Sequence, residues 1–248
     1  MTRRNDRRPK MKKLTGFISL VIVCTSGCMG NFPRPLMFEE GYQSADVYEQ
    51  EASPWDKKMS TSYAFSGWKK IQIAFSGGEP SMDQLQKAAE FFNKCWEFDH
   101  ENYNAWWGWG IVFGLMAETD MRWNALAHLQ DCIKCFEMAP VKNIPEEEWA
   151  NFYMDFANAC NGLGAYYKSE KENEKAGEIL DRGRNLLTDI LSKDRNVPGR
   201  FFFLLSVNCF YRDDYIQAQY YMQQAEGKNF SVPDSYQKEL REKLERIK

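Results

Sequence analysis

The hydrophobic positions of the chain follow a helical period from about residue 60 onward. Residues 83–98 show it most clearly, because apolar side chains recur there at intervals of three and four residues. These side chains are Leu85, Ala88, Ala89, Phe92, Cys95 and Trp96. The spacing places them on one face of a helix that packs against a core. No segment of useful length alternates with period two, so we predict an all-α protein without a β-sheet.

Breaker residues divide this helical pattern into pairs of helices. Residues 76–80 (SGGEP) form one such break, and Ser81 directly after them is the predicted N-cap of the following helix. Further breaks occur at Pro140, Pro145, Pro198-Gly199, Gly227 and Pro233-Asp234. We therefore predict an array of antiparallel helix pairs over residues 60–230. A polar C-terminal capping helix is predicted over residues 231–248.

Small and bulky residues follow a fixed order at several places in this array. They are Ala88, Phe92 and Cys95; Trp106, Gly110 and Phe113; Asp213, Tyr215, Ala218, Met222 and Ala225; and, more weakly, Gly164, Tyr167 and Ala176. The order resembles that of tetratricopeptide repeats, in which small residues lie where two helices touch and large ones fill the gaps. The resemblance covers roughly residues 61–228 and implies a superhelix of helix pairs. The spacing is not a strict repeat, so another helical array or bundle is the alternative.

The N-terminal segment has the order of an export signal. Lys12 and Lys13 precede the uncharged stretch 14–23, which is about half as long as a bilayer-spanning helix. Thr25-Ser26-Gly27-Cys28 follows and resembles the lipobox of bacterial lipoproteins, although Thr25 stands where an aliphatic residue is usual. The resemblance implies that residues 1–27 are a signal peptide, with Met1 or Met11 as the start. A non-cleaved signal anchor or an ordinary secretory peptide is the alternative.

The same resemblance implies that Cys28 carries the lipid and becomes the mature N-terminus. Acyl chains supply roughly 0.8 kcal/mol per buried methylene, so two or three of them anchor a domain durably. Residues 28–59 are then the lipidated N-terminus and a tether, with a short helix near 44–52. The alternative to a tether is an N-terminal extension that packs along the first repeat. We expect a lipid-anchored protein of the bacterial cell envelope. An outer-membrane location facing the periplasm is favoured over the inner membrane.

The charge of the chain argues against nucleic acid as a partner. Residues 1–27 hold seven basic side chains and one acidic one, which leaves residues 28–248 with 25 basic and 34 acidic groups and a formal net charge of −9. Nucleic-acid binding is dominated by neutralisation of phosphates with basic side chains. An acidic body of this kind favours a protein or peptide partner instead.

The candidate chemistry of the chain is sparse. Cys132 and Cys135 form its single C-x-x-C, but a structural zinc site needs four ligands, and these two thiols fall on inward-facing helix positions. His128 lies one turn away from Cys132 on the same face and is interpreted as a packing residue. Glu146–Glu148 follow Pro145 and match the positive end of a helix dipole. We predict no catalytic residue, no metal and no cofactor; a thiol or metal protein that uses Cys132 and Cys135 is kept as an alternative.

The cluster Trp106, Trp107 and Trp109 carries the strongest functional hint. One helix face cannot hold all three, so Trp107 is predicted to point away from the packing face, or else to pack beneath the preceding helix or tether. In the family that the chain resembles, the first helix of each pair lines a concave groove. The repeat positions whose side chains line that groove are occupied here by three pairs of residues. These are Asn104 and Trp107, Asn158 and Asn161, and Arg200 and Phe203. The resemblance implies that these side chains bind a partner.

These features predict a membrane-anchored scaffold or adaptor that binds a protein or peptide partner of the envelope through a helical-repeat groove, and that is not an enzyme. The eight tryptophans and twelve tyrosines motivate an alternative, a lipoprotein that binds the cell wall or another glycan. The sequence does not indicate the oligomeric state.

Overall fold

The computed structural model describes residues 51–75, 81–119, 124–193 and 196–247. The predicted signal peptide, the lipidation site Cys28 and most of the predicted tether lie outside these residues. So does all but the end of the helix predicted near 44–52, and residues 51–53 belong to no helix.

The described residues form helices and no strand, so the all-α prediction is confirmed for them. The elements in chain order are α1 (Pro54–Phe75), α2 (Met82–Phe98), α3 (Tyr103–Thr119), α4 (Ala125–Met138), the short 3₁₀ helix η2 (Val141–Asn143), α5 (Glu146–Ser169), α6 (Asn173–Lys193), α7 (Gly199–Tyr211), α8 (Tyr215–Gly227) and α9 (Asp234–Glu245). No helix in this part of the chain is both long and apolar enough to cross a membrane.

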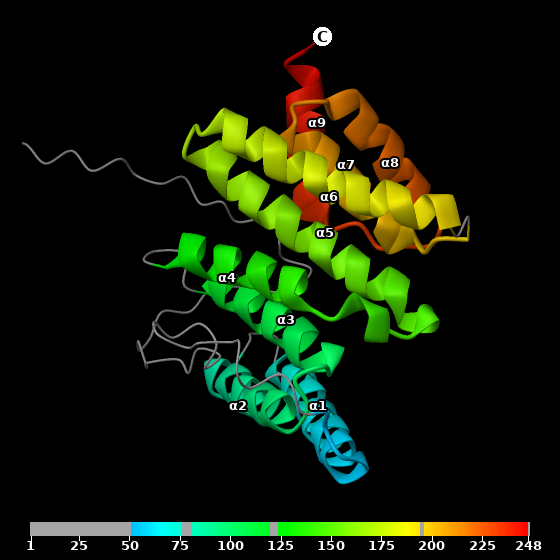
Figure 1. The fold of residues 1–248 in the computed structure, drawn as a ribbon. Coiled ribbons are helices and arrows are strands. Elements are labelled where there is room, and N and C mark those ends of the chain that lie inside the picture. Colours follow the sequence, from blue (N-terminus) through cyan, green and yellow to red (C-terminus); the bar gives the residue numbers. More distant parts are fainter. Residues whose placement is uncertain (1–50, 76–80, 120–123, 194–195, 248) are drawn as a thin grey trace, which may run out of the picture.

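Helices that are adjacent in the chain pack as pairs, and the pairs are stacked in chain order (Figure 1). The pairs are α1 with α2, α3 with α4, α5 with α6, and α7 with α8, and α9 lies against α8. Each first helix of a pair also contacts the first helix of the next pair, so α1, α3, α5 and α7 follow one another in space. We call the surface that these four helices form together the first-helix face.

The packing of α2 and α3 follows from the sizes of the facing residues. The six apolar residues of the predicted α2 stripe are all buried. The ring of Phe92 lies so close to Gly108 of α3 that a Cβ atom there would be 2.2 Å from it. Gly110 accommodates the ring of Phe136 from α4 in the same way, at 2.7 Å. Glycine at these positions lets large rings of the second helices reach the backbone of α3.

The first helix begins at Pro54, earlier than the helical pattern predicted. Ser53 and Asp56 form a capping box: the amide of Asp56 donates to Ser53 Oγ and the amide of Ser53 donates to Asp56 Oδ2, both at 3.2 Å. Pro54 is well suited to the first helical position because its fixed φ matches the helix and its missing N–H is not needed there. Ser81 precedes α2 as predicted, and its backbone carbonyl accepts from the amides of Gln84 and Leu85. Its side chain makes no capping bond.

Three helices of the C-terminal half end with the same backbone turn. Lys171, Asp213 and Asn229 have positive φ values of 65°, 62° and 59° after α5, α7 and α8. In each case the next amide donates to a carbonyl five residues earlier, as in Glu172 to Tyr167 at 2.9 Å. This is the Schellman motif, which satisfies carbonyls at a helix end and reverses the chain.

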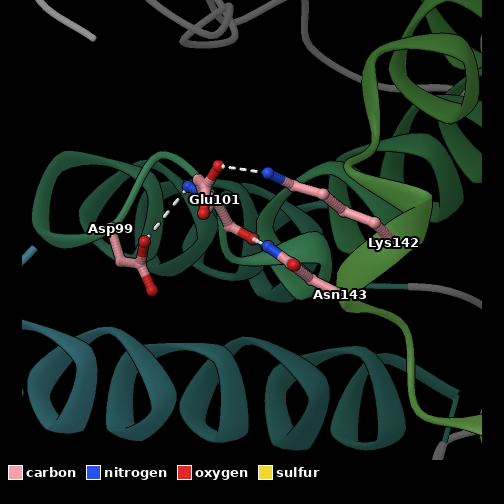
Figure 2. A network of polar contacts seen from close by, with 4 residues as sticks. All are labelled: Asp99, Glu101, Lys142 and Asn143. Atoms are coloured by element: carbon pink, nitrogen blue, oxygen red, sulfur yellow. Dashed lines mark hydrogen bonds and ion pairs between the residues drawn. The ribbon is translucent and has the colours of Figure 1, made fainter. Parts of the chain in front are cut away.

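A surface network joins the connection after α2 to the connection after α4 (Figure 2). Glu101 accepts from Lys142 Nζ at 2.8 Å through its side chain and from Asn143 Nδ2 at 2.9 Å through its backbone carbonyl. Its own amide donates to Asp99 Oδ1 at 3.1 Å. The network links the loops of successive pairs on the solvent side, and the exposed Glu101–Lys142 ion pair adds little stability.

Candidate functional site

The first-helix face carries polar contacts between successive first helices. Trp68 of α1 donates from Nε1 to Asn104 Oδ1 of α3 at 2.9 Å. Trp107 of α3 donates from Nε1 to Asp155 Oδ2 of α5 at 2.9 Å. Arg200 of α7 forms an ion pair with the other oxygen of the Asp155 carboxylate. We call these five residues the polar ladder, because they connect all four first helices.

Aromatic rings support the polar ladder. The rings of Trp68 and Trp107 meet edge to face with centroids 5.4 Å apart, and Phe152 meets Trp107 from α5 at 5.6 Å. Such contacts hold the two indole rings in orientations that aim their N–H groups at Asn104 and Asp155. The Asp155 side chain is 13% exposed, and bonds to a charged acceptor are stronger than neutral ones. The ladder therefore fixes the relative positions of the first helices.

A cavity of about 70 Å³ opens between α3, α4 and α5. Its polar lining consists of Glu118 from α3 and of Asp155 and Asn158 from α5. Gly114 of α3 and Gly162 of α5 also line it, and Cys132 lines it from α4. Asp155 thus belongs to both the ladder and the cavity, so the cavity adjoins the first-helix face and is closed on one side by α4.

Glu118 is the most perturbed carboxyl of this cavity. It lies partly buried in the last turn of α3, and burial raises its pKa to about 9 from an ordinary value of 4.5. Desolvation disfavours the charged form of a carboxyl group when no cation compensates it. The side chain is therefore mainly protonated at neutral pH in the structure.

Three of the residues predicted to bind a partner lie on the first-helix face with part of their surface accessible. Asn104 and Arg200 are members of the polar ladder, and Asn158 lines the cavity. The structure therefore brings these positions from α3, α5 and α7 onto one surface.

The other three residues, Trp107, Asn161 and Phe203, are buried, and Trp107 packs against Trp68 of an earlier helix as the alternative prediction has it. Trp107 is 8% exposed because α3 is surrounded by α1, α2, α4 and α5. For the same reason all three tryptophans of its cluster are buried. Asn161 is 1% exposed; it donates to the Leu204 carbonyl at 3.0 Å and accepts from Asn208 at 2.7 Å. Phe203 stacks on Phe230. The last two lie three positions after Asn158 and Arg200, which turns them toward neighbouring helices.

The cysteine pair occupies packing positions. Cys132 and Cys135 are buried free thiols, and burial raises the pKa of both well above the ordinary range. A thiolate is the form that attacks electrophiles or binds metals, so this environment disfavours both uses. Within the described segments no group of three His, Cys, Asp or Glu side chains is arranged to hold a metal ion. His128, which the sequence places next to Cys132, stacks on Phe113 with centroids 6.1 Å apart.

The aromatic residues mostly build the core. Of the tryptophans in the described segments, Trp55 is 60% exposed, and Trp96, Trp106, Trp107 and Trp109 are buried. Trp68 and Trp149 are partly buried against the same core. The aromatic content that motivated a glycan-binding alternative is thus largely explained by packing.

Two acidic members of the site were not singled out from the sequence. Glu118 is the one charged residue of α3, and Asp155 is the one charged residue between Trp149 and Tyr167 in α5. A lone acidic residue in an otherwise uncharged buried helix is the signal that identifies both, since such a charge needs a specific partner. Comparison of the chain with known protein families, with curated proteins and with solved structures gives no match.

Proposed function

We propose that this protein is a lipid-anchored scaffold of the bacterial envelope that binds an extended segment of a partner protein along its first-helix face. The observation that carries the proposal is the cavity between α3 and α5, bordered by the polar ladder. It offers an amide, two carboxyl groups and apolar walls on a surface built by successive helix pairs. Stacked helix pairs commonly use such an extended surface for partner binding.

The repeated architecture supports a superhelix like that of tetratricopeptide repeats. The first helices contact one another as well as their own partners, and two of the pairs reverse direction with the same Schellman turn. The first helices begin at Pro54, Tyr103, Glu146 and Gly199, which are 49, 43 and 53 residues apart. These units are longer than the ~34 residues of the family, so the proposed likeness concerns arrangement rather than length.

Site-specific photo-crosslinking in native membranes tests the binding face. A photoreactive phenylalanine analogue replaces Asn158 in one variant and the exposed Glu178 of α6 in a matched control. We expect a discrete protein adduct from position 158 and none from position 178, because the first face holds the cavity. Equal adducts from both positions, or none from position 158, would contradict the proposed face.

Metabolic labelling with a fatty-acid analogue tests the anchor separately. The Cys28→Ser variant should lose the label and leave the membrane fraction, whereas the Cys24→Ser control should keep both properties. Labelled Cys28→Ser protein would overturn the proposed anchor without affecting the binding face.

A further inference from the structure

The cavity on the first-helix face is a slot between two helices that run in the same direction. Tyr103 and Glu148, near the starts of α3 and α5, are joined by a hydrogen bond of 2.9 Å, and Trp107 reaches Asp155 further along. Glu118 follows Trp107 by eleven residues, which corresponds to a rise of roughly 16 Å along the helix. The two carboxyl groups therefore lie toward opposite ends of the slot.

The two carboxyl groups differ in how they are compensated. Asp155 accepts from Trp107 and is paired with Arg200. Within the described part of the chain, Glu118 has neither a hydrogen bond nor an ion pair, and only burial affects its charge. A carboxyl group placed in a cavity without a cation is costly to ionise, so it provides a place for a cation supplied from outside.

The walls of the slot suit one kind of cationic group. Ile111 and Leu115 from α3 and Leu129 from α4 provide apolar surface beside Glu118. A basic side chain buries its methylene stem along apolar surface and keeps its charged end at a polar site. The volume of about 70 Å³ is small, which favours the compact ammonium group of lysine over the planar guanidinium of arginine.

We propose that the slot is a subsite for a lysine side chain of the bound segment, with Glu118 as its counter-charge. This inference rests on the proposed peptide-binding function and names the residue type that the face selects. The formal charge of −9 on residues 28–248 is complementary to a basic partner segment. Replacement of the lysine by a neutral residue would leave the Glu118 carboxylate without a counter-charge and would lower the binding affinity. The subsite therefore provides specificity for lysine over neutral residues.

Two peptide libraries presented to the full-length protein in detergent micelles test the subsite. Both contain extended ten-residue peptides that are random except at a central position, which is lysine in one library and norleucine in the other. Norleucine keeps the aliphatic stem and lacks the ammonium group. We expect the protein to retain the lysine library about tenfold better, which corresponds to about 1.4 kcal/mol.

Variants identify the group that is responsible for this preference. Glu118→Gln keeps the shape of the side chain and should bind both libraries equally, while the exposed control Glu178→Gln should keep the tenfold preference. Carbodiimide coupling should join peptide lysines to Glu118 in the unaltered protein, with the modified residue located by mass spectrometry. A preference that survives in Glu118→Gln overturns the subsite.

The libraries also separate this inference from the proposed function. Equal retention of both libraries by the unaltered protein overturns the lysine subsite and leaves peptide binding intact. Retention of neither library overturns peptide binding and the subsite with it.

The pH dependence of retention gives a second readout. The other titratable groups that line the slot are Cys132 on α4 and Asp155 on α5. Because Glu118 must lose a proton when a lysine ammonium group binds, affinity for the lysine library should rise up to tenfold per pH unit between pH 6 and 9. In Glu118→Gln that slope should vanish, and a slope that persists there contradicts the assignment.

Discussion

The two interfaces that α5 makes with its neighbouring first helices are filled to different extents. Toward α7, Phe201 is fully buried and Asn161 bonds to the Leu204 carbonyl and to Asn208. Toward α3, the cavity beside Glu118 remains between the helices. The closed interface holds a phenylalanine and paired amides, whereas the open one has Gly114 and Gly162 at its lining positions.

Two properties decide where this stack of helix pairs has room for a ligand: how closely the first helices approach and how large the side chains between them are. The backbone of α5 lies closer to that of α7 than to that of α3, and glycines line the α3–α5 side. Stability and binding should therefore separate: substitutions at the α5–α7 interface should cost stability, and substitutions at the α3–α5 cavity should affect binding.

The largest effect is expected from Phe201→Ala at the closed interface. Removal of a fully buried phenylalanine loses apolar burial and leaves a cavity, so the free energy of unfolding should fall by about 3–5 kcal/mol. Urea denaturation followed by circular dichroism measures it. Leu115→Ala at the open interface is the matched control and should cost about 1 kcal/mol, because Leu115 is only partly buried and already borders empty space. Equal losses would contradict the contrast between the interfaces.

Replacement of one asparagine at each interface should give the next largest difference. Asn161→Ala removes the side-chain bond to the buried Leu204 carbonyl and one of the two bonds that the Asn208 amide donates, and should lower the free energy of unfolding by about 2 kcal/mol. Asn158→Ala changes a residue that lines the cavity, so its stability should stay within about 0.5 kcal/mol of the unaltered protein. The same urea titration compares both; a large loss for Asn158→Ala would mean that the cavity side is packed as tightly.

Glu118→Gln should stabilise the protein, with an effect that depends on pH. The folded-state pKa of about 9 lies above the ordinary value of 4.5, so the folded state holds the proton more tightly than the unfolded chain does. The stability associated with this group is fully present below pH 4.5 and is lost as the pH rises toward 9. Glutamine avoids that loss, so the variant should be more stable than the unaltered protein at pH 8 and equally stable at pH 4. Thermal unfolding at both pH values checks this, and equal gains at both would refute the role of burial.

The smallest effect is expected at the surface network between the loops. Lys142→Met removes the exposed ion pair to Glu101, whose pKa is lowered by that lysine, and should leave the urea midpoint unchanged. Asn143→Ala removes the hydrogen bond to the Glu101 backbone carbonyl in the same network. The urea midpoint of this variant is compared with that of Lys142→Met. A shift of the midpoint in Lys142→Met would show that the loops, and not only the interfaces, hold the pairs together.

Periodicity was enough to predict an all-α chain and the packing face of α2. The α2 stripe is buried at all six predicted positions, and Glu146–Glu148 occupy the first turn of α5. The start of α1 was missed because Pro54 was taken as part of the tether, although Ser53 and Asp56 three residues later mark a capping box. Local signals of this kind can be read from sequence because they depend only on neighbouring residues.

The site was harder to predict because it depends on how helices face one another. The offsets of the repeat family located Asn104, Asn158 and Arg200 on the first-helix face. Asn161 and Phe203, which the same offsets selected, are buried, because a rotation of a helix by one position decides whether a side chain meets solvent or a neighbour. Glu118 could have been noticed as the one charged residue of α3, but the cavity beside it depends on how α3, α4 and α5 pack, which the sequence pattern does not give.

The position of α9 has a consequence for how copies of this chain meet. Tyr236 and Leu240 cover the aromatic side chains of α7 and α8, while Lys238, Arg241 and Glu242 point to solvent. Stacked helix pairs are prone to continue from one molecule into the next wherever an apolar end is bare. A layer of charge over that end disfavours head-to-tail stacking of copies of this chain through α9.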